Sequence, residues 1–237
     1  MAGDKPELDQ ARAAILRATL THVPFDGWSE AAIAAGIRDA GQRESLSTLA
    51  FPDGPQGLAE YYSDTADRRM VAGLDLDAIA KLPIRERIIR AVRLRLVQAE
   101  NEREALKTLM TWFAYPAHQA LAAKCLYRTV DVIWRAIGDT STDFNFYSKR
   151  AILAGVLAAT VLYWLGDDSE GAVDSEAFLD RRIEDVMAFE KAKGRAREWL
   201  AELPDPFRIL RDATRHRKKD DGGDPDTPAG NAGRSKP

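Results

Sequence analysis

The longest proline-free stretch of this chain constrains its fold more than any other feature. Between Pro116 and Pro204 there is no proline, and the apolar residues of this stretch recur at intervals of three, four and seven. Because proline removes a helical hydrogen bond, a long uninterrupted stretch with this spacing predicts amphipathic helices. No part of the sequence alternates convincingly with a period of two, and no Asn-Gly or Asp-Gly turn joins two β-branched segments. We therefore expect an all-α fold.

The prolines and the apolar spacing divide the chain into helices and parts. The tail from Asp220 has no large apolar side chain to offset its ordering entropy, so it is predicted to be disordered. We expect a helix-turn-helix-like N-terminal part at 1–74, a helical bundle at 75–192, a basic amphipathic segment at 193–219 and a disordered tail at 220–237. The helices are predicted near residues 7–21, 29–36, 42–49, 55–73, 83–100, 102–114, 117–137, 148–165 and 174–192.

Side chains for catalysis or metal binding are few. The chain has one cysteine and three histidines, which are far apart in sequence, and it contains no Gly-x-Ser-x-Gly, phosphate-loop or HExxH motif. We predict no disulfide, catalytic residue, metal site or cofactor, and a protein that is not an enzyme. An enzyme with a hidden carboxylate site remains an alternative. Cys125 is expected in the core, His22 at a helix end, and Asp167 in a solvated loop.

Residues 28–58 have the layout of a helix-turn-helix. Ser29 is placed to cap an Ala-rich helix, Gly36 is expected in the turn, and a short second helix precedes Phe51. This layout resembles the DNA-binding end of the TetR repressor family. Residues 23–60 carry a net charge of −4, however, which repels a DNA duplex. We expect a TetR-like scaffold without nucleic-acid binding, and the alternative is a TetR-like transcriptional regulator that senses an apolar ligand.

An aromatic and polar block follows the predicted helix at 117–137. In GDTSTDFNFYSKR, residues 138–150, the rings of Phe144, Phe146 and Tyr147 stand among Asp, Ser and Asn in a predicted polar turn. These rings can anchor the turn on the core. They can also form an exposed patch that binds a protein partner, because such interfaces favour aromatic residues. The residues alone leave both interpretations open.

Positive charge is concentrated near the C-terminus. Residues 191–219 carry a net charge of +6, and the rest of the chain carries −9. A helix with an apolar side and many basic residues can lie in an anionic membrane surface, or it can dock on its own bundle. Both interpretations stay open here. The apolar side consists of Trp199, Leu203, Phe207 and Leu210, and the basic residues include Arg208 and Arg211.

Four blocks of sequence carry a resemblance to a known family. They lie within residues 11–191 and read VPFDGWSEAAI, FPDGPQGLAEYYSDTADRRM, RTVDVIWRAIGDTSTDFNFYSKR and FLDRRIEDVMAFEK. Together they resemble the Coq-nine family of ubiquinone-biosynthesis proteins. The resemblance implies a TetR-like helical fold without DNA binding, a homodimer, and an apolar cavity that binds isoprenoid lipids. It also implies that the protein delivers a quinone intermediate from the membrane to the di-iron demethoxyubiquinone hydroxylase.

The resemblance assigns roles to residues in two segments. Residues 143–147 fall on the family's partner-facing segment, with Phe146 at a position where Trp is common, so the candidate hydroxylase contacts are Asp143, Phe144, Asn145, Phe146 and Tyr147. The C-terminal segment matches the family's membrane-contact element in kind rather than in letters. Its candidate membrane contacts are Trp199, Leu203, Phe207, Arg208, Leu210 and Arg211.

Large apolar residues on the central helices are candidates for the walls of a lipid cavity or a dimer interface. The helix at 151–165 is apolar on nearly all sides, so we expect it to be enclosed by neighbouring helices, by a second subunit or partly by lipid. The candidate lipid-contact residues are Trp112, Phe113, Ile133, Trp134, Leu157, Val161 and Leu162.

The N-terminus and the apolar runs bear on where the protein works. MAGDKPELDQ is polar and mildly acidic, unlike a secretory signal or an Arg-rich transit peptide. The longest uncharged run, 151–166, has 16 residues. A membrane-spanning helix needs about 20 residues, so we expect a buried helix here. Because mitochondrial members of the family carry a transit peptide, we expect a bacterial cytoplasmic protein that is peripheral to the inner membrane.

Overall fold

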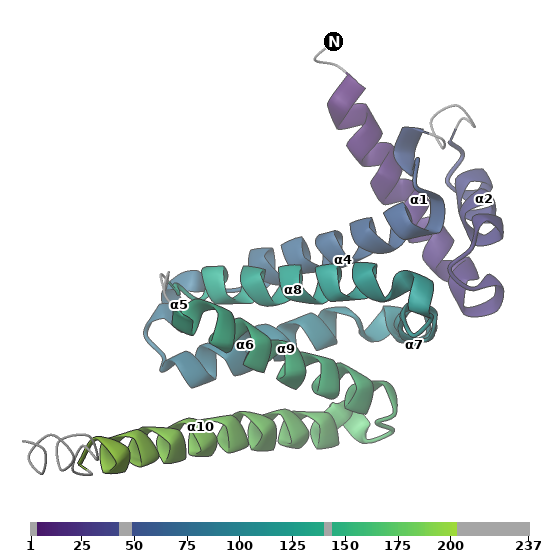
Figure 1. The fold of residues 1–237 in the computed structure, drawn as a ribbon. Coiled ribbons are helices and arrows are strands. Elements are labelled where there is room, and N and C mark those ends of the chain that lie inside the picture. The colour runs from purple at the N-terminus through teal and green to yellow at the C-terminus, as the bar shows by residue number, and fades with distance from the viewer. Residues whose placement is uncertain (1–3, 43–48, 140–143, 203–237) are drawn as a thin grey trace, which may run out of the picture. The chain divides into compact units, whose positions relative to one another are not determined.

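The computed structural model describes the backbone of residues 4–42, 49–139 and 144–202, and the side chains of 7–42, 49–139 and 146–188. Within these ranges the chain is helical and has no β-strand, which confirms the predicted all-α fold. Short 3-10 turns join some of the helices, at 100–102, 116–118 and 170–172. The helices (Figure 1) are α1 (Asp4–Asp26), α2 (Glu30–Asp39), α4 (Gly54–Gly73), α5 (Leu76–Ala80), α6 (Ile84–Gln98), α7 (Arg103–Phe113), α8 (Gln119–Ala136), α9 (Phe144–Leu165) and α10 (Val173–Glu202).

The chain divides into two compact units, Met1–Met187 and Ala188–Pro237. The helices from α1 to α9 and the first half of α10 belong to the first unit. Of the second unit, the structure describes the helical backbone of residues 188–202. The two hydrophobic cores and the pockets described below lie in the first unit. The four predicted parts of the chain stay a prediction.

An N-terminal core forms around Trp28. The indole Nε1 of Trp28 donates a hydrogen bond to the carbonyl oxygen of Ala105 in α7 (3.2 Å), and its ring lies 5.5 Å from that of Tyr62 in α4. Ser29 caps α2 as predicted, because its Oγ accepts a hydrogen bond from Ala32 N (3.2 Å). The predicted helix at 42–49 lies mostly outside the described residues. The other large buried members of this core are Ile15, Leu16, Val23, Ile33, Phe51, Leu58 and Leu109.

Helices α1 and α2 approach each other closely at Gly36. A Cβ atom at Gly36 would lie 2.1 Å from Thr19 Oγ1, 2.7 Å from Thr19 N and 2.8 Å from Thr19 Cα. Thr19 is fully buried in α1. Gly36 therefore lies inside α2, where its missing side chain lets two helix backbones come together, and the predicted position in a turn is wrong.

The second core lies among α6, α8, α9 and the first half of α10. The helices α4 and α8 pack along each other, α6 packs against α4, and α9 packs against α8 (Figure 1). The helical spacing predicted apolar stripes on single helices, and most of those residues lie in this core. The predicted stripe from Val130 to Ile137 is buried, as are Leu179 and Ile183 of α10.

Several helix boundaries differ from the predicted ones. Helix α1 continues past Pro24 to Asp26, although this proline removes one helical hydrogen bond. Helix α9 begins at Phe144, so part of the aromatic and polar block is helical instead of a turn. Helix α10 continues to Glu202, since no proline interrupts it. The sequence also missed α5, which Asp75 caps by accepting a hydrogen bond from Ala78 N (2.9 Å).

Helix α9 is apolar on both its covered and its uncovered side. Residues Phe146–Leu165 form the one helix, among those described, that is long and apolar enough to cross a membrane, and a third of that window is buried in the fold. The core helix of a soluble protein can be equally long and apolar. Leu153 and Leu157 face the core, whereas Leu162 and Tyr163 are exposed. The first unit alone thus covers only one side of a helix that the sequence predicts to be enclosed.

Candidate ligand-binding cavity

A mostly apolar cavity lies between α4, α6, α7, α8 and α9. Its volume is about 430 Å³. Small-molecule sites in proteins range over about 300–1,000 Å³. Small side chains on several helices leave this space open, namely Ala66, Ala99, Ala122, Ala123 and Ala158. Larger residues complete the wall, among them Leu96, Leu106, Leu109, Met110, Phe113, Leu126, Leu157, Val161 and Leu162.

The polar residues that line the cavity gather where α6 and α8 meet α4. We call them the polar wall: Tyr62, Ser63, Arg95, Cys125 and Thr129. All except Arg95 are buried, with at most 6% of each residue exposed. The other side of the lining contrasts with this wall, because Leu162 of α9 is 61% exposed. The polar lining residues therefore come from α4, α6 and α8, whereas every lining residue from α7 and α9 is apolar.

Asp67 of α4 holds the polar wall together. Thr129 Oγ1 donates a hydrogen bond to Asp67 Oδ1 (2.9 Å), and Arg95 Nη1 lies 3.3 Å from the same oxygen. Arg128 Nε lies 3.5 Å from Asp67 Oδ2. Burial raises the pKa of the Asp67 carboxyl, and the neighbouring Arg95 and Thr129 act against this rise. The ion pairs fix the rotamers of the wall and balance the charge of Arg95.

Two residues of the polar wall, Tyr62 and Cys125, are held in their neutral forms. Burial raises the pKa of the Tyr62 hydroxyl, and Glu102, which accepts a hydrogen bond from it, raises that pKa further. Burial also raises the pKa of the Cys125 thiol. Cys125 is therefore a buried core thiol, as predicted, and lacks the thiolate character of a nucleophile.

The cavity brings together four of the seven predicted lipid-contact residues: Phe113, Leu157, Val161 and Leu162. Trp112 instead stacks on His118, with ring centroids 3.6 Å apart, and packs against the N-terminal core. Ile133 and Trp134 are buried in the second core and do not line the cavity. Contact of the four lining residues with lipid stays a prediction.

Sequence reasoning missed the polar wall entirely. Arg95 stands in a helix with five arginines, and Thr129 and Ser63 are ordinary helix residues. The signal that could have found them is the pairing of a buried Asp67 with arginines on other helices. That pairing depends on helix register, which the sequence does not give.

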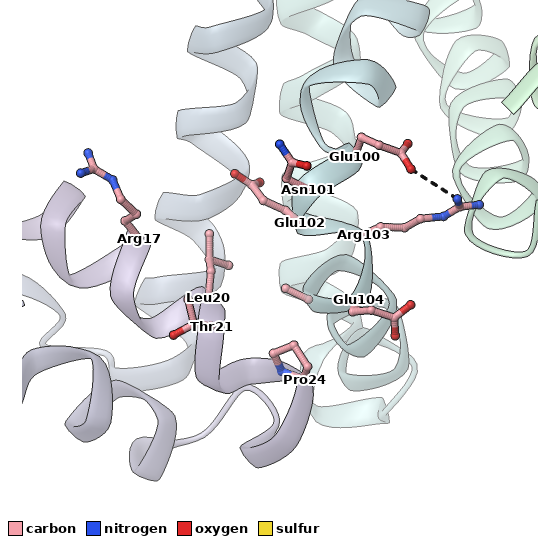
Figure 2. Close-up of a pocket in the computed structure, with 10 residues that line it drawn as sticks. Arg17, Leu20, Thr21, Pro24, Glu100, Asn101, Glu102, Arg103 and Glu104 are labelled. Carbon is pink, nitrogen blue, oxygen red and sulfur yellow. Dashed lines mark hydrogen bonds and ion pairs between the residues drawn. The ribbon is translucent and has the colours of Figure 1, made fainter. Parts of the chain in front are cut away.

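A second pocket, of about 370 Å³, lies between α1 and the segment 100–105 (Figure 2). Three of its charged groups, Glu100, Glu102 and Arg103, already have protein partners. The carboxylate of Glu102 accepts hydrogen bonds from both terminal nitrogens of Arg69 (2.7 and 2.9 Å). Arg103 pairs with Glu100 (3.5 Å) and donates hydrogen bonds to the carbonyl oxygens of Trp164 and Asp167. These groups tie helices together, and we assign no ligand to this pocket.

Most of the predicted partner-facing residues lie in the first turn of α9. Asp143 and the side chains of Phe144 and Asn145 lie outside the described residues. Phe146 and Tyr147, which we call the aromatic pair, meet edge to face with ring centroids 5.1 Å apart. Tyr147 is 67% exposed, so it is not an anchor of this segment on the core of its own unit. The exposed ring is compatible with a partner surface.

Arg150 fixes the aromatic pair to the bundle. Its guanidinium carbon lies 3.4 Å from the centroid of the Phe146 ring, and its Nε donates a hydrogen bond to Asp131 of α8 (2.8 Å). Asp139 lies 3.5 Å from its Nη1. Arg150 is almost fully buried, so this buried cation holds the base of the aromatic pair in place.

Asp167 lies in a different environment from the one predicted. It is buried, and its carboxylate accepts hydrogen bonds from the backbone N–H groups of Ser169 (2.9 Å) and Ser175 (2.8 Å) and from both hydroxyls. These hydrogen bonds lower the pKa of the Asp167 carboxyl. Asp167 therefore caps the start of α10 and is not part of a solvated loop.

The two histidines in the described part of the chain, His22 and His118, each contact another side chain. His22 Nε2 lies 2.6 Å from Asp39 Oδ2 of α2, so His22 contacts the neighbouring helix as well as lying near the end of its own. His118 stacks on Trp112. No group of three or more His, Cys, Asp or Glu that could hold a metal occurs in the part of the chain that the structure describes.

The predicted membrane-contact residues cannot be placed. Trp199 belongs to the backbone of α10, but its side chain is outside the described residues. Leu203, Phe207, Arg208, Leu210 and Arg211 are outside them altogether. Their contact with a membrane stays a prediction.

The fold is that of the TetR-type regulators. The chain superposes with a TM-score of 0.57 on the TetR transcriptional regulator from Nitrosomonas europaea, over 73% of this chain and 95% of the other. The two sequences are 20% identical, so the likeness shows the fold alone. The protein is thus a TetR-like helical protein with a cavity among its central helices, which confirms the predicted fold.

Sequence comparison then shows which family the chain resembles. Residues 119–190 match the family model COQ9. The chain is 30% identical over 185 residues to the ubiquinone biosynthesis protein COQ9, mitochondrial, of Drosophila melanogaster, and 28% identical over 189 residues to that of Homo sapiens. Each alignment covers 76% of this chain, but the chain spans only 56% and 58% of those relatives. The predicted resemblance is confirmed, and residues 119–190 carry the COQ9 family region.

The predicted bacterial cytoplasmic location is wrong by the same comparison. The relatives from Drosophila melanogaster, Rattus norvegicus, Homo sapiens and Schizosaccharomyces pombe are all named as mitochondrial proteins. The expectation depended on a polar N-terminus without a transit peptide. The start of this sequence does not decide the location, because the chain covers only part of the animal relatives.

Proposed function

We propose that this protein serves ubiquinone biosynthesis as an accessory protein without catalysis of its own. It binds an isoprenoid quinone intermediate and presents it to the demethoxyubiquinone hydroxylase. The cavity among α4, α6, α7, α8 and α9 is the observation that carries this proposal, because its lining is mostly apolar and it has an exposed side. The names of the COQ9 relatives support the pathway.

The cavity offers a prenyl chain a favourable environment. Each CH₂ group moved from water into an apolar site contributes about 0.8 kcal/mol, so two isoprene units supply several kcal/mol without any polar contact. The volume of about 430 Å³ holds only part of a long tail. The rest of the tail leaves the cavity past the exposed side chain of Leu162.

Two surfaces support a role in delivery. The aromatic pair is held rigidly by Arg150 and presents Tyr147 to a partner, as interface anchors do. The uncovered side of α9 exposes Leu162 and Tyr163, which a second copy of the chain or lipid would cover. We propose the hydroxylase as the partner of the aromatic pair, a homodimer, and an anionic membrane surface as the contact of the basic segment 193–219.

Nucleic-acid binding is not part of the proposed function. The likeness to a TetR regulator is a likeness of fold, and residues 23–60 carry a net charge of −4. A TetR-type regulator would have to bind a DNA duplex at about 150 mM salt, and this acidic segment works against phosphate contacts. Specific duplex binding in a genomic selection would contradict this part of the proposal.

Mass spectrometry of lipids that co-purify with the protein tests the central claim. The variant Ala158→Phe adds a ring at a position that lines the cavity, so it should displace lipid. The matched control is Ala159→Phe, which makes the same change at the next residue of α9, outside the lining. We expect isoprenoid quinones or their precursors with the wild type and the control, and a strong loss with Ala158→Phe. The absence of such lipids from the wild type would contradict the proposal.

Binding to the hydroxylase tests the aromatic pair. Tyr147→Asp should weaken the complex by about 2 kcal/mol or more if this ring is a hot spot. The control is Tyr127→Asp, which places the same charge at another exposed tyrosine, on α8. Titration calorimetry measures the affinity of each variant for the hydroxylase. If the two affinities are equal, the aromatic pair is not part of the interface.

A further inference from the structure

We propose that the cavity takes its ligand head first. In this arrangement Arg95 binds a neutral, oxygen-bearing ring at the polar wall, and the apolar tail points out past Leu162. The inference rests on the proposed function, since it assumes that the cavity binds an amphipathic lipid. It adds the orientation of that ligand and the residue that recognises its ring.

The distribution of polar groups in the lining determines the orientation. Ser63, Cys125 and Thr129, on α4 and α8, are buried, whereas the lining residues of α9 are all apolar and one of them, Leu162, is mostly exposed. A ligand that entered with its tail first would place hydrocarbon against the polar wall and its oxygens beside exposed leucine. Burial of an uncompensated polar group is unfavourable, so the opposite orientation matches each part of the ligand to its surroundings.

Arg95 has hydrogen-bond donors to spare for this ring. A guanidinium carries five N–H donors. Among the described residues, its one ion pair is the 3.3 Å contact with Asp67, and Nη1 makes no hydrogen bond of good geometry there. The hydroxyls of Thr129 and Tyr62, in contrast, are engaged with Asp67 and Glu102, and that of Ser63 is engaged with the Cys125 thiol. Arg95 is therefore the group of the polar wall that can donate to a carbonyl or ether oxygen.

The charge balance of the wall selects the class of head group. The carboxylate of Asp67 already pairs with Arg95, and Arg128 lies 3.5 Å from its second oxygen. Glu60 in turn lies close to Arg128 (3.5 Å) and Lys124 (2.7 Å). The three cations and two carboxylates leave one positive charge, which Lys124 carries outside the lining on a side chain that is 62% exposed. Among these groups Arg95 is the one that lines the cavity, and Asp67 already compensates its charge, so the lining does not favour a phosphate. A neutral ring with carbonyl, hydroxyl or methoxy oxygens fits, and it must leave the cavity before another enzyme can act on it.

Binding of two probes with the same tail tests the inference on the wild type. The probes are a dimethoxy-methyl-benzoquinone with a decyl chain, and decylbenzene, which has no oxygen. We expect the quinone probe to bind at least about tenfold more tightly, as a hydrogen bond to a charged group would give. Equal affinities would overturn the head-group assignment and leave lipid binding intact. If neither probe binds, both the inference and the proposed function fail.

Variants test whether Arg95 is the residue that binds the ring of the quinone. The double variant Arg95→Met with Asp67→Asn removes the ion pair without leaving a buried charge unpaired, and it should abolish the preference for the quinone. The matched control is Arg93→Met with Asp180→Asn, which removes another ion pair of α6 (2.9 Å) away from this cavity. Arg95→Lys keeps the charge and should keep part of the preference. A preference unchanged in the folded double variant would exclude Arg95.

Photocrosslinking tests the orientation independently of any variant. One quinone probe carries a diazirine on its ring and another carries it at the end of the decyl chain. The ring probe should label peptides with Ser63 and Cys125, and the tail probe should label the peptide with Leu162. The reverse pattern would overturn the head-first orientation.

Discussion

Substitution of Gly36 by alanine tests whether α1 and α2 are held together by close backbone packing. The contact of the new Cβ with Thr19 N would be 2.7 Å, and ordinary contacts of this kind are 3.4 Å or longer. The two helices must therefore separate by about 0.3–0.7 Å to bring that contact to 3.0–3.4 Å. Since Thr19 is fully buried, its surroundings leave little room for such a shift.

Two opposing effects determine how much Gly36→Ala changes the free energy of unfolding. Overpacking of a core costs about 1–3 kcal/mol, whereas replacement of a helical glycine by alanine contributes up to about 1 kcal/mol. Because two of the three short contacts involve backbone atoms, we expect Gly36→Ala to lower the free energy of unfolding by about 1–2 kcal/mol. The matched control is Gly155→Ala in α9, where a Cβ meets nothing within 4 Å. That variant should be more stable than wild type by up to about 1 kcal/mol.

Urea denaturation measures the free energy of unfolding of both variants. We expect it to fall for Gly36→Ala and to rise for Gly155→Ala, while its dependence on urea concentration stays the same. A second variant separates side-chain from backbone contacts. Thr19→Ala in the Gly36→Ala background removes the 2.1 Å contact with Oγ1 but keeps those with N and Cα, so it should recover only part of the loss. If Gly36→Ala is as stable as Gly155→Ala, the close approach of α1 and α2 does not constrain this position.

Four more predictions follow from buried polar groups. Trp28→Phe removes the hydrogen bond to Ala105 and leaves unfilled space in a buried core, so it should cost about 1–3 kcal/mol in denaturant unfolding. Arg150→Met should cost about 3 kcal/mol or more, since it breaks a buried cluster of ion pairs, and a loss below 1 kcal/mol would contradict this. The lowered pKa of Asp167 stabilises the fold above pH 3.8, the ordinary pKa of an aspartate, and this contribution is lost as the pH falls below that value. The stability difference between wild type and Asp167→Asn should therefore shrink on acidification below pH 3.8, and a constant difference would refute the cap. The Cys125 thiol should react with iodoacetamide at pH 8 only when urea unfolds the protein, because burial raises its pKa, and fast labelling of the native protein would contradict this.

The sequence predicts the helices better than their ends. The spacing of Val130, Ile133 and Ile137 follows a helical period, and all three are buried as expected. The start of α9 at Phe144 could not be predicted, because polar residues between aromatic ones fit an exposed helix face as well as a turn. Likewise Gly36 was assigned to a turn, since only the neighbouring helix shows that a side chain would not fit there.

The candidate site depends on contacts that cross between helices, and these are the least predictable from sequence. Ala66 and Ala158 become cavity walls only because the helices that carry them face one another. Asp167 was expected in solvent, since its run of acidic residues is typical of a loop, yet Ser169 and Ser175 surround it. Trp112 was expected in the lining, but His118 and the N-terminal core take up its ring.

Leu162 belongs to two surfaces at once, since it lines the cavity and is 61% exposed on α9. A ligand in the cavity and anything that covers α9 must therefore touch the same side chain. Thermodynamic reciprocity then requires that, where the ligand strengthens the covering contact, the covering contact strengthens the hold on the ligand by the same factor. Loading of the cavity and covering of α9 are then coupled equilibria, and a change in one is measurable through the other.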